Sequence, residues 1–92
     1  MYNKIGVKKS TGRRMNMPHV EIKCYPGRTE EVKSKCALEV SKVVAETLGC
    51  NESAVSVAIK EIEQADWKEK VWNPQIVEEE KYLYKTPGYT CD

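Results

Sequence analysis

The order strand, long helix, strand after residue 18 constrains the fold of this chain most. Apolar and polar residues alternate over residues 18–24, which predicts a half-buried strand. A helix is predicted from Thr29, a good N-cap residue, to about Leu48, with Gly49 as the C′ residue. Residues 55–62 predict a second strand. Because a long helix joins the two strands, we expect them to be parallel, with a right-handed crossover.

The predicted helix carries apolar residues at spacings of three and four, a pattern that predicts one buried stripe. The stripe consists of Val32, Cys36, Val40, Val43, Val44, Thr47 and Leu48. The C-terminal third of the chain is less regular. We expect a loop with a short helical turn over residues 65–72. A helix should follow from Pro74 to about Lys85, because Asn73 can cap it and proline is favoured in the first helical position.

The length of 92 residues allows one small domain, which we assign to residues 18–92. So short a chain buries little apolar surface alone, which favours oligomerisation. A single βαβ unit also gives a sheet of only two strands, which cannot bury both of its faces. The predicted fold class is therefore α+β, a βαβ unit whose parallel strands pair with those of a second subunit. The result would be a four-stranded sheet with the helices on one face.

Residues 1–17 differ in charge from the rest of the chain. They hold five basic residues and no acidic one, whereas the remainder holds ten basic and 14 acidic residues. We expect this basic leader to be disordered or absent from the native protein. Arg13-Arg14 can be encoded by AGG-AGG, a purine-rich sequence that recruits bacterial ribosomes, and it stands two codons upstream of Met17. The alternative is a genuine basic tail that binds an acidic surface.

Composition and motifs argue against several classes of function. The net charge of +1 gives no case for nucleic-acid binding, and no apolar run is long enough to cross a membrane. No pair of the four cysteines has CxxC spacing and His19 is the only histidine, so no metal site is predicted and redox chemistry is disfavoured. We expect three core thiols and one on the tail, in a reduced cytoplasmic protein, although the even count leaves a disulfide open.

The run M-P-H-V-E-I-K-C-Y-P-G-R at residues 17–28 resembles the opening of proteins of the 4-oxalocrotonate tautomerase family. These proteins begin with an initiator Met, a Pro, a short strand and an Arg just before a long helix, and the resemblance continues through the second strand to Trp67. Trp72, Ile76 and the run K-T-P-G-Y at residues 85–89 are similar to the short dimeric bacterial tautomerases with a C-terminal extension. The resemblance implies a tautomerase-like (MIF-like) fold and catalysis without a metal or an organic cofactor. The family forms dimers or hexamers, and the C-terminal extension favours a homodimer.

The resemblance also implies a catalytic role for Pro18. Once Met17 is removed, the amine of Pro18 would act as a general base, with a pKa that an apolar pocket and nearby cations lower toward neutrality. The reaction would be the keto–enol tautomerisation of a small enol or keto acid, with neither nucleic acid nor membrane as a partner. If the leader stays attached, Pro18 is an internal imide nitrogen, and the alternative is a non-catalytic binding protein on the same fold.

Three further residues are expected to bind the substrate. Arg28 would grip a carboxylate, Trp67 would form an aromatic pocket wall and His19 would help to orient the substrate. The alternatives are a solvated arginine, a tryptophan that only packs in the core and a surface or interface histidine, and Lys23 receives no role. Where the best-known family members carry a second arginine, this chain has Ser56. A monocarboxylate such as an enolpyruvate therefore fits better than a dicarboxylate.

Overall fold

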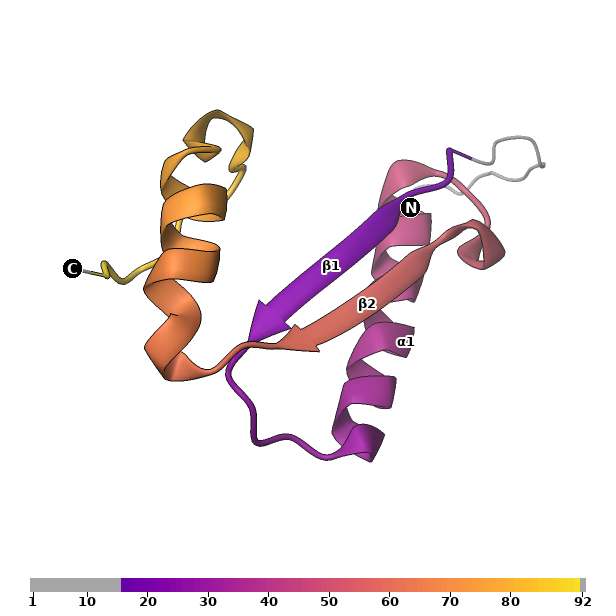
Figure 1. Cartoon of the computed structure of the whole chain (residues 1–92). Coiled ribbons are helices and arrows are strands. Elements are labelled where there is room, and N and C mark those ends of the chain that lie inside the picture. Colours follow the sequence, from indigo (N-terminus) through magenta and orange to yellow (C-terminus); the bar gives the residue numbers. More distant parts are fainter. Residues whose placement is uncertain (1–15, 92) are drawn as a thin grey trace. The chain divides into compact units, whose positions relative to one another are not determined.

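The computed structural model describes residues 16–91 (Figure 1). These residues form two compact units. The first comprises residues 16–22 and 27–60, and the second comprises residues 23–26 and 61–91. The predicted disorder of the basic leader concerns residues that lie outside the described part of the chain, apart from Asn16 and Met17.

The predicted βαβ unit is confirmed. Strand β1 (His19–Cys24) is followed by helix α1 (Glu30–Leu48) and strand β2 (Ser56–Glu61), and the two strands pair in one sheet (Figure 1). The Ser56 amide donates to the Pro18 carbonyl at 3.1 Å, and the Ile62 amide donates to the Cys24 carbonyl at 2.8 Å. The donor and the acceptor are separated by the same number of positions in both hydrogen bonds. The two strands therefore run in the same direction and are parallel.

Helix α1 begins and ends where its capping residues predict. The hydroxyl of Thr29 accepts a hydrogen bond from the Val32 amide at 3.2 Å, and Glu30 and Glu31 lie in the first turn, where the helix dipole favours acidic residues. At the other end Gly49 adopts a left-handed φ of 76°, and its amide donates to the Ala45 carbonyl at 2.9 Å. A glycine at this position avoids the steric cost that a Cβ would add.

The predicted buried stripe of α1 is only partly right. Val40 and Val44 are half-buried, next to the buried Ala45. The other five members are exposed: Val32, Cys36, Val43, Thr47 and Leu48. The residues that lose solvent contact recur at positions 33, 37, 40, 41, 44 and 45, and several of them are small. A short two-stranded sheet covers less of the helix than the width of its apolar stripe, so part of the stripe stays uncovered in one copy.

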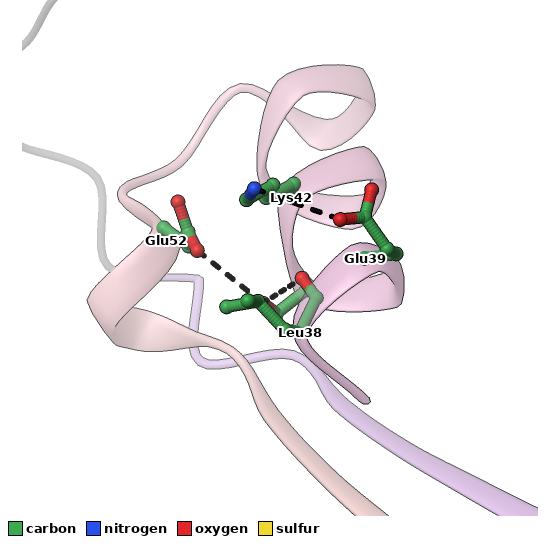
Figure 2. Close-up of polar contacts among 5 residues, drawn as sticks. Leu38, Glu39, Lys42 and Glu52 are labelled. Carbon is green, nitrogen blue, oxygen red and sulfur yellow. Dashed lines mark hydrogen bonds and ion pairs between the residues drawn. The ribbon is translucent and has the colours of Figure 1, made fainter. Parts of the chain in front are cut away.

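The middle of α1 is tied to the turn that leads into β2. The 3₁₀ turn η3 (Glu52–Ala54) lies beside the helix, and the Ser41 hydroxyl donates to the Leu38 carbonyl at 2.8 Å (Figure 2). The same hydroxyl lies 3.5 Å from a carboxylate oxygen of Glu52, a weak contact that joins the two elements. Lys42 and Glu39 form an ion pair at 3.7 Å on the neighbouring turn of the helix.

The prediction of a helix from Pro74 to about Lys85 is wrong. The second unit instead contains a π-helix, η5 (Lys68–Val77), between the short 3₁₀ turns η4 (Gln64–Asp66) and η6 (Glu80–Tyr82). Pro74 lies inside η5, and Asn73 does not cap a helix but accepts a hydrogen bond from the Glu78 amide at 3.0 Å, five residues on. A proline breaks the regular spacing of an α-helix, whereas the wider turn of η5 accommodates it.

Replacing Gly49 by alanine should lower the free energy of unfolding by about 1 kcal/mol, because a left-handed backbone is costly for a residue with a Cβ. The matched control is Gly88→Ala, because Gly88 does not have such a φ and an added Cβ meets no atom within 4 Å at either site. Urea unfolding of both variants measures the difference. Equal stabilities would show that Gly49 does not need its conformational freedom.

Candidate active site

Pro18 occupies the position at which the parallel ladder begins. It is half-buried, it directly precedes β1, and its carbonyl oxygen accepts the hydrogen bond from Ser56. Asn16 and Met17, just before it, adopt left-handed φ angles of 43° and 50°, which are uncommon for residues other than glycine. The extended backbone of the strand therefore starts at Pro18 and does not continue toward the leader.

His19 and Ser56 lie together beside Pro18. The Nδ1 atom of His19 and the hydroxyl oxygen of Ser56 are 2.6 Å apart, although the two residues are 37 positions apart in the sequence. Both are exposed, and each is the first residue of its strand. Parallel pairing brings the first residues of two strands to the same edge of the sheet, which explains their contact.

One face of the sheet is polar. Lys60 and Glu21 form an ion pair on the same face as His19 and Ser56, because alternate residues of a strand point the same way. The opposite face carries Val20, Ile22, Val57 and Ile59, all half-buried. The two faces therefore differ in chemistry, and the histidine–serine pair belongs to the polar one.

Arg28 lies far from Pro18 within one copy of the chain. It belongs to the connection that leaves the far end of β1 and leads to α1 (Figure 1). The six residues of β1 span about 20 Å, a length that no arginine side chain can bridge. One copy of the chain therefore does not bring together the two residues with the strongest predicted roles.

Trp67 lies in the second unit, within a cluster of four aromatic residues: Tyr25, Trp67, Trp72 and Tyr89. The rings of Tyr25 and Trp67 meet edge to face with centroids 5.2 Å apart. The indole Nε1–H of Trp67 donates to the Tyr89 hydroxyl at 3.3 Å, and the rings of Trp72 and Tyr89 lie 5.5 Å apart. This aromatic cluster ties the C-terminal segment to η5 and to the turn after β1.

Lys23 makes a side-chain contact within the second unit. Its ammonium donates to the side-chain oxygen of Gln75 in η5 at 2.8 Å, and the contact is partly buried. A partly buried hydrogen bond from a charged donor is stronger than one between neutral groups. Lys23 therefore fixes η5 to the end of β1, a structural task that accounts for a lysine that the sequence leaves without a role.

The cysteines and acids form no second site in the described part of the chain. All four cysteines are free, and Cys36 is exposed, so the prediction of three core thiols is wrong for this residue. Among residues 16–91, no group of three or more histidine, cysteine or acidic side chains is arranged to hold a metal ion. In the same residues, no helix has the length and apolar character that crossing a membrane requires.

The family model described as "Tautomerase enzyme" matches residues 18–68, which is more than half of the chain. The chain belongs to the tautomerase family. The match begins at Pro18 and ends one residue after Trp67, so it includes β1, α1 and β2. Membership of this family supports tautomerase activity, that of an isomerase.

Curated relatives of this tautomerase match over nearly their whole length. Tautomerase PptA of Enterobacter sp. (strain 638) is 39% identical over 75 residues, which cover 80% of this chain and 99% of the relative. The protein of the same name from Klebsiella pneumoniae (strain 342) is 41% identical with the same coverage. A crystal structure of a candidate 4-oxalocrotonate tautomerase from methicillin-resistant Staphylococcus aureus is 36% identical, covers 51% of this chain and 76% of its own, and has a TM-score of 0.49.

Sequence reasoning missed two contacts of the tautomerase. No sequence pattern near either residue predicts the hydrogen bond between His19 and Ser56. In the sequence, Ser56 is notable only because it stands where the best-known family members carry a second arginine. The bond between Tyr89 and Trp67 follows a motif that the sequence does display, the run K-T-P-G-Y, but the motif does not say which residue the tyrosine meets. Both contacts depend on the tertiary arrangement.

If Tyr89 anchors the C-terminal segment, Tyr89→Phe should lower the free energy of unfolding by about 0.5–1 kcal/mol, the value of one hydrogen bond. Tyr89→Ala should cost about 1 kcal/mol more, because the ring contact with Trp72 is also lost. Tyr84→Ala is the control, since Tyr84 is fully exposed, and it should change stability by less than about 0.5 kcal/mol. Chemical denaturation followed by tryptophan fluorescence tests this, and equal effects of Tyr89→Ala and Tyr84→Ala contradict it.

Proposed function

We propose that this protein is a cofactor-independent keto–enol tautomerase whose general base is the amine of Pro18, exposed once Met17 is removed. The substrate is a small enol carboxylate such as an enolpyruvate. The observation that carries the proposal is the position of Pro18. The match to the tautomerase family begins at this residue, and the ladder of the sheet holds its carbonyl in place.

The proposed reaction moves one proton within the substrate. The unprotonated amine of Pro18 removes the proton of the enol hydroxyl and returns a proton to the carbon, which gives the keto acid. A base of this kind works best when its pKa lies near the working pH. An apolar environment and nearby cations both disfavour the protonated amine, so they lower the pKa of the proline nitrogen toward that range.

The proposal requires that residues 1–17 are not attached to Pro18 in the active protein. An acylated proline nitrogen has no basic lone pair, so a chain that continues upstream has no base at this position. Every described helix and strand lies after Pro18, so a protein translated from Met17 retains all of them. Removal of an initiator methionine before a residue as small as proline then frees the amine.

A second copy of the chain supplies Arg28 in this proposal. Because Arg28 and Pro18 lie at opposite ends of β1, a two-fold related partner can bring its own Arg28 toward Pro18, where the guanidinium binds the substrate carboxylate. The exposure of apolar side chains supports a homodimer. Val32, Leu38, Val43 and Leu48 of α1 are each at least half exposed, and only Ala45 and Val71 are buried among the described hydrophobic residues.

The same proposal assigns the remaining residues. Trp67 keeps water from the amine as an aromatic wall, and His19 orients the substrate. With one arginine per site and Ser56 at the position of a second, the site accepts a monocarboxylate more readily than a dicarboxylate. We place the enzyme in the cytoplasm, where its free thiols stay reduced.

Protein translated from Met17 should ketonise phenylenolpyruvate, and Pro18→Ala should lower kcat by at least about 100-fold, because a general base contributes on the order of 10² to 10⁴. The full 92-residue chain is the matched control, since it has the same fold but an acylated proline nitrogen, and it should be inactive. Intact mass confirms which residue is first, and circular dichroism confirms folding. Turnover by Pro18→Ala at the wild-type rate would rule out the amine as the base.

Arg28→Ala should lower kcat/KM for the same substrate by about 10²-fold or more, because a charged hydrogen-bonding group is lost from the reacting anion. The two impaired proteins, Pro18→Ala and Arg28→Ala, should then regain activity when they are refolded together. In a 1:1 mixture half of the dimers are mixed, and each has one intact site, so about a quarter of the wild-type activity is expected. If Arg28 acts on Pro18 of its own chain, no mixed dimer has an intact site and the mixture stays inactive.

A further inference from the structure

We propose that Ser56 is a positioning residue that holds the imidazole of His19, and that His19 gives the substrate a neutral hydrogen-bond donor beside the Pro18 amine. This inference rests on the proposed function and adds to it a reason for the choice of substrate. The pair would bind an uncharged oxygen of the enol acid, at the end of the substrate away from the carboxylate that Arg28 holds.

The geometry of the pair supports this role. The short separation of 2.6 Å between His19 Nδ1 and the Ser56 hydroxyl indicates a well-formed hydrogen bond. The backbone amide of Ser56 also donates to the carbonyl of Pro18. Ser56 therefore contacts both the proposed base and the residue next to it, one through the backbone and one through the side chain.

We assign the serine hydroxyl as the donor of this hydrogen bond, since a hydroxyl and a ring nitrogen can each take either role. When the serine hydroxyl donates to Nδ1, the neutral ring carries its proton on Nε2, and Nε2–H becomes the donor for the substrate. A hydrogen bond to one ring nitrogen commonly fixes both the orientation and the tautomer of a functional histidine. Without Ser56 the ring is free to rotate, and Nε2–H is presented only part of the time.

A neutral donor at this site has a consequence for specificity. It can bind a keto, enol or hydroxyl oxygen, but it does not balance the charge of a second carboxylate as an arginine would. The pair therefore favours enol monocarboxylates, and it discriminates against enol dicarboxylates of similar length.

The kinetic test compares Ser56→Ala, His19→Ala and the double variant in protein that begins at Pro18. Each single variant should raise KM for phenylenolpyruvate about three- to tenfold, the range expected for one neutral hydrogen bond, with kcat changed less than about twofold. The double variant should have a KM no higher than that of His19→Ala, because Ser56 acts through the histidine.

Two further variants serve as controls. Ser56→Thr keeps the hydroxyl and should have a KM close to that of the wild type. Ser34→Ala, an exposed serine on α1, is the control and should match the wild type.

A spectroscopic readout separates positioning from a general loss of structure. His19 is the only histidine, so its ring nitrogens are assigned directly in ¹⁵N NMR. The wild type should show an unprotonated Nδ1 and a protonated Nε2 at neutral pH, and Ser56→Ala should move the ring toward a mixture of tautomers. A wild-type ring protonated on Nδ1 overturns the assignment.

The outcomes also distinguish this inference from the function on which it rests. If the wild type is active, Pro18→Ala is inactive and Ser56→Ala keeps the wild-type KM, the positioning role fails and the tautomerase proposal stands. If Ser56→Ala and His19→Ala raise KM additively, the serine does not act through the histidine. If the wild type ketonises no enol acid, the proposed function fails, and the inference fails with it.

Discussion

The parallel pairing of β1 and β2 determines which residues meet at the candidate site. Because α1 carries the chain back before β2 begins, both strands start at the same edge of the sheet. One backbone hydrogen bond, from Ser56 to Pro18, sets the register at that edge. The same pairing brings His19 to Ser56 across 37 positions of sequence. The chemistry proposed at Pro18 is therefore a product of strand register.

In one copy of the chain, the sheet and the proposed active site are both incomplete. Its sheet has two strands, its long helix leaves much of its apolar stripe in solvent, and its candidate arginine lies at the wrong end of β1. In the proposed homodimer, a two-fold related copy would extend the sheet, cover apolar side chains and deliver Arg28 through one interface. We regard assembly and catalysis as linked for this reason.

Local rules sufficed to predict the first two thirds of the fold. Thr29 and Gly49 set the ends of α1 through bonds to their own neighbours, and the alternation of β1 needs no distant partner. The same rules failed at Pro74, because its place in a π-helix depends on the packing of η5 and not on proline's usual preference. Pro18 and Arg28 stand out in the sequence only through the resemblance to a family. The partner of His19 has no signal in the sequence, because only the folded register brings the two residues together.

The proposed chemistry requires that Pro18 carries a free amine, a substantial fraction of which is unprotonated at neutral pH. The most direct measurement is a ¹⁵N NMR titration of protein labelled at proline and translated from Met17. We expect an amine resonance for Pro18 that titrates near neutrality, below the usual range of a free proline amine. An amide resonance that does not titrate, or an amine that stays protonated well above neutral pH, would show that Pro18 is not the base.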